Sequence, residues 1–387
     1  MIDFNFSQEC CGCGACADAC ALGCIAIIKD KHDFRIPQVN ADKCVNCGKC
    51  DKVCPVLNVA RKKNDAQKLI CTYNNDEEKR MQGSSGSVFY EIAKETINQG
   101  GVVFGAAFVE KLQLKHIKVE KIEDIYPLMK SKYIQSNTNG VFQQVKDELK
   151  KGRKVCFVGT PCHCQALYNF LGKKTNDNLI LIDFICHGVP SQSLFDKAIA
   201  QFEKDNDCDV TGFSFRRKTG NSLRNYEISY IDKSGNHNNQ IGCARKFHYY
   251  CGYLKYFTFR DSCYQCKFVG HDRITDMTLG DFWGLEKIEP QLNDINKGYS
   301  MLIVNSNKGA ELFKKLSGNF TSKEYPLELA ARNNYAYCKP AFKSKVHNWF
   351  LHDYTRLPYD KLAKRYFFWK EDKLRWILRC LIKKLKI

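Results

Sequence analysis

No run in this 387-residue sequence approaches the roughly 18 consecutive apolar residues that a membrane-spanning helix needs. The first ten residues, MIDFNFSQEC, lack a basic region followed by an apolar stretch, so no signal peptide is predicted and a cytoplasmic location is expected. Zinc-finger spacings with histidine are absent, and no basic stripe precedes the C-terminal segment, which argues against nucleic-acid binding. Hydrophobic residues nevertheless make up 44% of the chain, which excludes a disordered protein.

Cysteine is abundant, with 22 residues, ten of which lie in the first 54 positions. In a chain without an export signal, this number favours metal chemistry over disulfides. Two quartets share the spacing C-x2-C-x2-C-x3-C, and Pro55 follows the second of them: Cys10, Cys13, Cys16 and Cys20, then Cys44, Cys47, Cys50 and Cys54. This spacing is typical of bacterial ferredoxins that hold two [4Fe-4S] clusters.

Each cluster is predicted to take three ligands from one quartet and its fourth ligand from the other quartet. The reason is that a tight loop presents three sulfurs to one cluster, while the fourth cysteine of the quartet faces the other cluster. The predicted ligand sets are Cys10, Cys13, Cys16 and Cys54 for the first cluster, and Cys20, Cys44, Cys47 and Cys50 for the second. A pair of zinc knuckles is the alternative, and the two matching quartets argue against it. Cys11 and Cys24 are left over and are predicted to be packing residues. The α+β ferredoxin domain is predicted to span residues 1–58, with a hairpin around 33–37.

A polar linker over residues 60–68 is predicted to lead into a larger domain, residues 69–345, in which helices and strands alternate. Helices are predicted over 88–98, 142–150 and 193–203, and strands over 102–108, 154–159, 179–186, 210–215, 227–231, 277–281 and 300–305. This order predicts an α/β domain with a mixed sheet.

Four further cysteines lie where predicted strands end or loops turn. Cys162 directly follows a strand, Cys186 ends another, and Cys263 and Cys266 form a CxxC pair. Ligands usually bind at strand ends of an α/β sheet, so these thiolates are candidates to hold a third [4Fe-4S] cluster. A zinc site or plain buried cysteines remain alternatives at this point.

Several motifs give the chain a resemblance to a known family. They are Gly83-Ser84-Ser85-Gly86-Ser87, Ser131-Lys132-Tyr133, Gly159-Thr160-Pro161-Cys162, Cys186-His187-Gly188-Val189-Pro190-Ser191, Ser262-Cys263-Tyr264-Gln265-Cys266 and Thr278-Leu279-Gly280-Asp281-Phe282-Trp283-Gly284. On these motifs the chain resembles, over roughly residues 1–345, the iron–sulfur flavoprotein family of coenzyme F420 (deazaflavin) hydrogenase and dehydrogenase beta subunits. The resemblance implies an FAD-binding α/β domain with one [4Fe-4S] cluster, here behind a fused ferredoxin domain, and thereby favours the third cluster. In two departures from the family pattern, Cys164 could compete as a ligand, and Ser87 replaces a usual glycine.

The flavin is expected near the run from Gly83 to Ser87, because the unpaired amides at the start of a helix bind anions. An ordinary capping loop is the alternative there. The candidate cofactor-binding residues are Ser84, Ser85, Gly86, Ser87, Lys132, Tyr133, His187, Arg260 and Arg273. Among them Lys132 and the two arginines are candidate anion contacts, although a solvated surface charge is the alternative for each arginine. Tyr133, His187 and Trp283 are candidates for shaping the pocket, and no catalytic base is identified.

The formal net charge is +18, and three clusters of about −2 each would lower it to roughly +12. Residues 346–387 are predicted to form a basic amphipathic helical tail, since 361–387 contain ten Lys or Arg and two acids. An apolar stripe follows helical spacing, flanked by Trp369 and Trp376: Leu374, Ile377, Leu378, Leu381, Ile382 and Leu385. Such a helix suggests contact with an anionic membrane surface; packing on its own domain or on a partner is the alternative.

Two functions from different classes fit these features. The first is an oxidoreductase that passes electrons between clusters and a flavin, which in turn exchanges hydride with a soluble carrier or a substrate. The resemblance implies a deazaflavin carrier, and it extends to bacterial members associated with surface-polysaccharide biosynthesis, whose fused ferredoxin domain and basic tail this chain shares. The second is an electron-transfer adaptor that serves a redox partner protein and has no substrate of its own. A redox sensor is disfavoured because nothing resembles an output domain.

Overall fold

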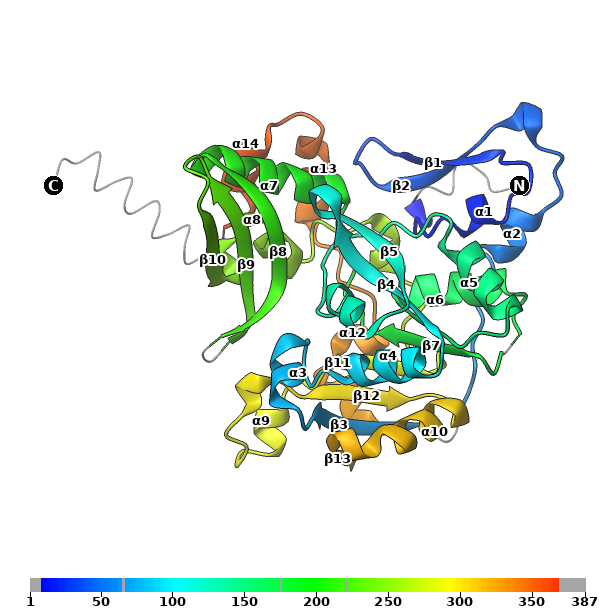
Figure 1. Cartoon of the computed structure of the whole chain (residues 1–387). Coiled ribbons are helices and arrows are strands. Elements are labelled where there is room, and N and C mark those ends of the chain that lie inside the picture. The colour runs from blue at the N-terminus through cyan, green and yellow to red at the C-terminus, as the bar shows by residue number, and fades with distance from the viewer. Residues whose placement is uncertain (1–7, 65–66, 175, 220–221, 369–387) are drawn as a thin grey trace, which may run out of the picture.

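The computed structural model describes residues 8–368 except 65–66, 175 and 220–221. Figure 1 shows three parts: a small N-terminal hairpin with short helices, a large central sheet, and a second, smaller sheet at the far end from the hairpin. Among the described residues, no helix combines the length and the apolar character needed to cross a bilayer.

The N-terminal part has the predicted α+β ferredoxin architecture. β1 (Ile25–Lys29) and β2 (Arg35–Val39) form an antiparallel hairpin, and α1 (Ala15–Asp18) and α2 (Lys49–Val53) follow the two cysteine loops. Each helix begins after a glycine with positive φ, at Gly14 (77°) and Gly48 (70°). Glycine adopts this conformation without a Cβ penalty, so each loop can turn sharply between its second and third cysteine.

The central sheet has eight strands and is mixed, as predicted. Its strand order is β13-β3-β12-β11-β7-β6-β4-β5, and the four neighbours β11, β7, β6 and β4 are parallel. The strands are β3 (Lys68–Asn74), β4 (Val102–Val109), β5 (Gln113–Val119), β6 (Val155–Gly159), β7 (Leu179–Phe184), β11 (Met277–Asp281), β12 (Ser300–Val304) and β13 (Phe320–Tyr325).

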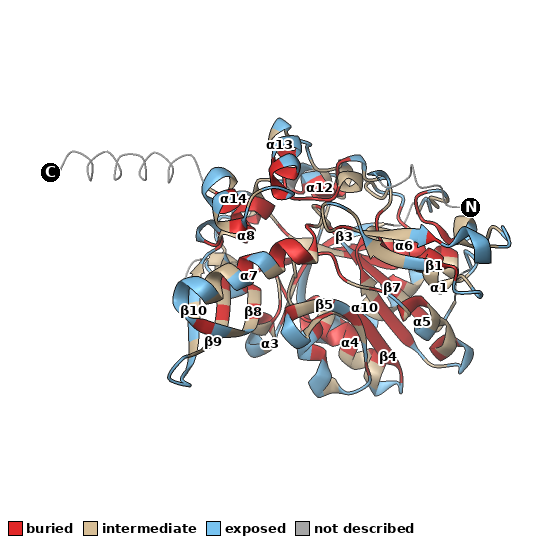
Figure 2. Cartoon of the chain, turned by 90° about the horizontal axis from the view of Figure 1, so that it is seen from above, coloured by how far each residue is buried: buried red, intermediate tan, exposed pale blue. Residues whose placement is uncertain are grey.

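Both faces of the sheet are covered, and alternation along the strands decides which side chain meets which layer. In β4, Val102 and Phe104 pack toward α5 (Val141–Lys150) and α6 (Pro161–Phe170), whereas Val103 and Ala107 pack toward α4 (Val88–Asn98) and α10 (Asn307–Leu316). α3 (Glu77–Gln82) precedes α4, and α9 (Leu285–Ile288), α11 (Glu328–Asn333) and α12 (Tyr335–Cys338) follow the last parallel strand. Figure 2 shows the strands buried between these layers.

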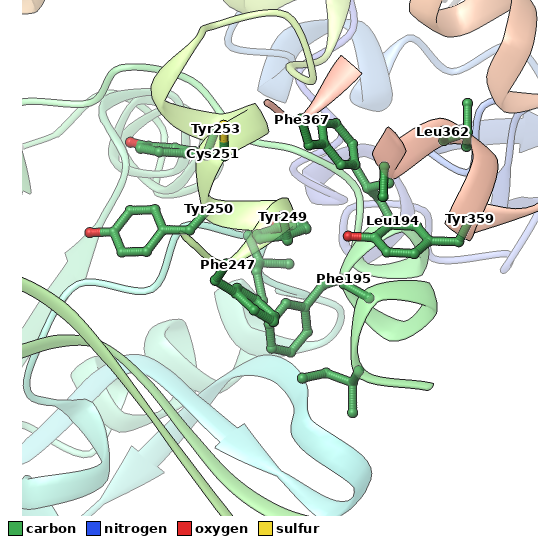
Figure 3. Packing of buried hydrophobic residues seen from close by; sticks show 14 of the residues in the cluster. Leu194, Phe195, Phe247, Tyr249, Tyr250, Cys251, Tyr253, Tyr359, Leu362 and Phe367 are labelled. Atoms are coloured by element: carbon green, nitrogen blue, oxygen red, sulfur yellow. The ribbon is translucent and has the colours of Figure 1, made fainter. Parts of the chain in front are cut away.

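The second sheet is antiparallel and separate from the central one. It contains β8 (Cys208–Thr219), β9 (Ser222–Asp232) and β10 (His237–Cys243), so the strands predicted over 210–215 and 227–231 belong to it. α7 (Gln192–Asn206) packs against β8. Three further helices share a hydrophobic core with α7 and the sheet: α8 (His248–Leu254), α13 (Lys345–Tyr354) and α14 (Tyr359–Tyr366). Figure 3 shows their shared aromatic core, in which Tyr250 and Tyr253 project from α8 on the side away from Tyr359 and Phe367.

The described part of the C-terminal segment is packed into this core. Phe350, Leu362 and Phe367 are each at most 2% exposed and lie in one hydrophobic cluster with residues of α7 and α8. The remaining segment, residues 369–387, lies outside the described residues, and with it the predicted apolar stripe and both of its tryptophans.

Candidate functional site

The first predicted ligand set comes together at the start of the ferredoxin domain. Burial and the nearby thiols of Cys10 and Cys54 raise the pKa of Cys16 to about 12. Cys13 interacts with both Cys10 and Cys16. Cys54, the fourth cysteine of the second quartet, thus lies near the first three cysteines of the first quartet, as the ferredoxin spacing predicts.

The second set gathers around the hairpin. Cys20, Cys44 and Cys50 pack around Ile25 and Val39, while Cys47 is exposed at the surface. The second set therefore lies nearer to solvent than the first.

Crowded thiols fit a cluster because their negative charges repel one another, and a core of about +2 offsets that repulsion. Among the described residues, no three His, Cys, Asp or Glu side chains are arranged to hold a single metal ion. The case for [4Fe-4S] clusters rests instead on the quartet spacing and on the gathering of the thiols.

Side chains of the larger domain donate hydrogen bonds to backbone carbonyls in and beside the first ligand set. Gln135 Nε2 donates to the carbonyl of Cys11 at 3.0 Å, and Thr138 Oγ1 donates to that of Cys13 at 2.5 Å. Asn169 Nδ2 donates to the carbonyl of Cys54 at 3.3 Å. The first predicted ligand set therefore lies at the interface between the domains.

A second contact fixes the same interface. Asp18 of α1 accepts hydrogen bonds from the backbone N–H groups of Gly140 (2.7 Å) and Phe142 (3.2 Å) at the start of α5. Its carboxylate thereby satisfies unpaired amides of a helix in the other domain, as an N-cap residue does. Arg260 Nη2 donates to the carbonyl of Arg35 in β2 at 2.7 Å.

The third predicted set meets at one cavity of about 460 Å³ beside this interface. Cys162, Cys186, Cys263 and Cys266 all line it. Cys162 lies in the first turn of α6 after β6, Cys186 follows β7, and the CxxC pair is carried by a short 3-10 helix over Asp261–Gln265. The four cysteines therefore lie at the carboxyl edge of the parallel strands, the position predicted from the sequence.

The chemistry of this thiol set also fits a cluster. Burial, followed by neighbouring thiols, raises the pKa of Cys263 to about 12 and that of Cys266 to about 11. Cys186 and Cys162 interact with both of these residues. Cys164 is not among the cavity-lining residues, because its thiol is buried in the core of the domain and donates to the carbonyl of Ile182 at 3.3 Å.

Most predicted flavin contacts line the same cavity: Ser84, Ser85, Ser87, Lys132, Tyr133, His187 and Arg260, together with Trp283. Gly86 and Arg273 are not in its lining. Gly86 packs against the backbone of β3, where a Cβ would collide with the carbonyl of Thr72. Arg273 donates from Nη1 to Asp183 Oδ2 at 2.7 Å in a buried ion pair.

The serine-rich loop before α4 is held in an unusual conformation. Ser85 (φ 48°) and Ser87 (φ 62°) both adopt left-handed backbone angles, and Ser84 Oγ accepts a hydrogen bond from the backbone N–H of Ser131 at 2.9 Å. Ser87 Oγ, in a side chain 4% exposed, has no hydrogen-bond partner among the described residues. Strained backbone and an unpaired buried hydroxyl at a helix start fit a loop that clamps an anionic group such as a cofactor phosphate.

Lys132 lines the cavity next to Ser131, which is hydrogen-bonded to the serine-rich loop. Its Nζ donates to the carbonyl of Met129 at 2.7 Å, and burial, with a smaller effect from Lys130, lowers its pKa to about 7. Tyr133 next to it stacks on Tyr253 with ring centroids 4.2 Å apart. These aromatic rings give the cavity a flat apolar surface.

His187 lies beside the third thiol set. Burial lowers its pKa, and its Nδ1 is 3.5 Å from the Tyr256 hydroxyl.

Sequence reasoning did not identify the ion pair between Arg216 of β8 and Asp281 of β11. Arg216 donates to both carboxylate oxygens at 2.8 Å, and Asp281 also accepts from Ser85 Oγ. Arg216 further donates to the Tyr133 hydroxyl at 3.1 Å. Asp281 does end a predicted strand inside a quoted motif, whereas nothing in the sequence distinguishes Arg216 from its neighbour Arg217. The pair joins the two sheets across the cavity.

Comparisons with known proteins agree with this architecture. Residues 152–326 match the sequence model of the family that comprises the C-terminal part of the beta subunits of coenzyme F420 hydrogenase/dehydrogenase, and residues 9–58 match that of the 4Fe-4S dicluster domain. Over residues 152–326 and 9–58, respectively, these matches confirm the predicted resemblance to the family and the predicted iron–sulfur ferredoxin domain.

Two individual proteins are also similar. One of the subunits of the F(420)H(2) dehydrogenase of Methanosarcina mazei is 22% identical over 221 residues, which are 54% of this chain and 62% of the relative. The chain thus spans less than two thirds of that relative. A chain of the F420-reducing [NiFe] hydrogenase complex from Methanosarcina barkeri aligns over 77% of this chain and 90% of its own length, with 16% identity and a TM-score of 0.43.

Proposed function

We propose that this chain, whose residues 152–326 belong to the family of C-terminal regions of coenzyme F420 hydrogenase/dehydrogenase beta subunits, is an iron–sulfur flavoprotein oxidoreductase. Its dicluster domain and the names of its relatives support an electron-transfer role in an oxidoreductase. The observation that carries the finer proposal is that four thiols and the strained serine loop line the same cavity. A cluster and a flavin bound there would be neighbours.

The order of the centres follows from the contacts. The second ligand set reaches the surface at Cys47, the first set lies at the domain interface, and Cys162 of the third set packs against the hydrophobic cluster that contains Cys11 of the first loop. Electrons would therefore pass between the surface and the cavity in single steps along this line. A flavin bound in the cavity would supply the exchange between single electrons and a two-electron hydride.

Within the cavity, this chain's own residues would bind and orient the flavin. The loop around Ser87 would hold a phosphate group, and Tyr133 would offer a stacking surface for the flavin ring. Arg216 donates to the Tyr133 hydroxyl and Asp281 accepts from Ser85 Oγ, so this ion pair would keep Tyr133 and the loop in position.

The charge of the cavity favours an anionic carrier or substrate. Cations predominate among the charged lining residues that are described: Lys130, Lys132, Arg216, Arg224, Arg260 and Lys267, against Glu9 and Asp281. Arg224 is exposed and lies over the Trp283 ring at 4.2 Å, with both side chains lining the cavity. Coenzyme F420, named in the relatives, is the first carrier to test, and an anionic sugar intermediate of polysaccharide biosynthesis is the second.

The test is composition. Protein purified without oxygen should contain about twelve iron atoms and one flavin per chain, released by acid and identified by mass. Changing Cys263→Ser and Cys266→Ser together should remove about four irons and leave the ferredoxin signals in electron paramagnetic resonance (EPR) spectra. Cys243→Ser, at an exposed cysteine of β10, is the matched control and should lose no iron.

An electron-transfer adaptor without its own substrate is the second candidate. The exposed Cys47 and its neighbour Val45, 69% exposed, favour it because they offer a partner protein access to the second cluster. Absence of flavin after incubation with FAD and FMN, together with cluster reoxidation by a protein partner alone, would support this account.

We also propose that the basic C-terminal segment contacts an anionic membrane surface. Because Leu362 and Phe367 are buried, a deletion that tests this must remove residues 369–387 and leave α14 intact. The deletion should abolish binding to anionic liposomes, and unchanged binding would contradict the proposal.

A further inference from the structure

We propose that Cys11, which belongs to none of the ligand sets, positions the first ferredoxin cluster against the third cluster and carries the contact between them. The inference rests on the proposed function for the third cluster. Cys11 is thus a positioning residue rather than a ligand.

The location of Cys11 sets it apart from an ordinary packing cysteine. It lies between Cys10 and Cys13 in the first loop, yet its side chain lines the cavity of the larger domain together with Cys162. It is 8% exposed and packs in one hydrophobic cluster with Cys13, and Cys162 packs against the same cluster. Cys11 therefore lies where a predicted ligand of the first cluster and a predicted ligand of the third come together.

The loop that carries Cys11 is clamped in this place. Its carbonyl accepts from Gln135, and the same Gln135 accepts from Arg260 Nη1 at 3.1 Å. The next residue, Gly12, has φ of 67° and lies so close to both side chains that a Cβ there would collide with each. Cys11 is therefore held toward Cys162.

A thiol at this position has two consequences that an aliphatic side chain would lack. Its single S–H can donate to a ligand sulfur, and hydrogen bonds to cluster sulfurs raise the reduction potential because they stabilise the more negative, reduced cluster. It also lies in the packed region that joins Cys13 to Cys162. With both clusters bound, one electron would leave the first cluster and enter the third; the first would be oxidised, the third reduced, and no proton or bond would change place.

The test compares variants with and without a donor at this position. Cys11→Ala and Cys11→Val remove the donor, and Val fills the space if Ala compromises folding; Cys11→Ser keeps a donor. Cys24→Ala is the matched control, because Cys24 is also a buried, non-quartet cysteine of the ferredoxin domain, and its neighbours are Cys20 and Cys44 of the second set.

Each variant is purified without oxygen, its iron is counted, and its first and third clusters are titrated by EPR against ambient potential. We expect full iron content throughout. In the Ala and Val variants, the reduced-to-oxidised ratio of the cluster that accepts the single S–H, through Cys13 or through Cys162, should fall about tenfold at a fixed potential, since a hydrogen bond to a charged acceptor is worth about that factor. This corresponds to about 59 mV for one electron. Magnetic interaction between the first and third clusters should weaken, and the Ser and Cys24→Ala variants should stay near the wild type in both measurements.

Two outcomes overturn the inference while leaving the proposed function intact. Unchanged potential and coupling at full iron content would make Cys11 a packing residue, and loss of about four irons would make it a ligand. Failure of the proposed function is a different result: the unaltered protein would then hold only about eight irons, and the Cys263/Cys266 variant would lose none.

Discussion

Removing the carboxylate of Asp281 should destabilise the protein severely. Its two oxygens accept two hydrogen bonds of 2.8 Å from Arg216, and the two side chains are only 15% and 4% exposed. Asp281→Ala would leave the guanidinium buried, with the Tyr133 hydroxyl and the carbonyl of Leu223 as its remaining described partners. Breaking one side of a buried pair costs about 3–5 kcal/mol, because an uncompensated charge stays in the interior.

The contribution of the Arg216–Asp281 pair to the free energy of unfolding depends on pH. Burial by itself raises the pKa of Asp281, but the nearby Arg216 outweighs it, and the pKa stays below its usual value. A lowered carboxyl pKa adds stability that is fully present above the unfolded value of about 3.9 and is lost as pH falls through the native value. Between pH 6 and 8, the whole contribution of the pair is therefore present.

The assay is urea unfolding at pH 7 of the cluster-loaded protein, followed by tryptophan fluorescence. Asp281→Ala and Arg216→Met should each lower the midpoint strongly, whereas the double variant Arg216→Met/Asp281→Leu should lose less than the worse single, since no charge is then left unpaired. Asp272→Ala, at an exposed carboxylate nearby in sequence, is the control and should change the free energy of unfolding by less than about 0.5 kcal/mol. Losses that simply add in the double variant would refute a coupled buried pair.

Three further predictions concern single contacts. An anionic ligand that needs charged Lys132, whose pKa is about 7, should bind up to about tenfold more weakly per pH unit above 7, and Lys132→Met should remove that slope in calorimetric titrations. Gly12→Ala should cost more than about 1 kcal/mol in urea unfolding, clearly more than Gly23→Ala, which has a similar positive φ but open space around it. Asp18→Ala should cost about 1 kcal/mol by uncapping α5 at Gly140, and Asp18→Asn should restore most of it; equal losses would contradict the capping role.

What the sequence predicts well is local. The cluster ligands follow from spacing within two short loops, and the glycines at positions 14 and 48 that shape these loops are adjacent to the cysteines that they serve. Three of the four parallel strands, β4, β6 and β7, are mainly apolar runs, which allows their positions to be predicted within a few residues.

What the sequence does not show depends on distant partners. Arg216 and Asp281 are 65 positions apart, and only folding of the second sheet over the first brings them together. Arg260 and Arg273 were predicted as anion contacts from their residue type alone. The structure gives both of them buried partners within the protein, the carbonyl of Arg35 and the carboxylate of Asp183. The hydrophobic residues of α14 likewise fit a free amphipathic helix as well as a packed one until α7 and α8 are in place.

Docking of the ferredoxin domain should depend on its iron. The larger domain binds backbone carbonyls of the first loop at Cys11 and Cys13 through Gln135 and Thr138, and the carbonyl of Cys54 after the second loop through Asn169. These carbonyls point correctly only while the loop keeps the shape that a bound cluster imposes, because a metal site and the fold around it form together. Removing iron with a chelator should therefore release the ferredoxin domain and expose the linker over residues 59–64 to protease before the central sheet is cut. Iron-free protein that resists cleavage there as well as the loaded protein would show that the interface holds without the cluster.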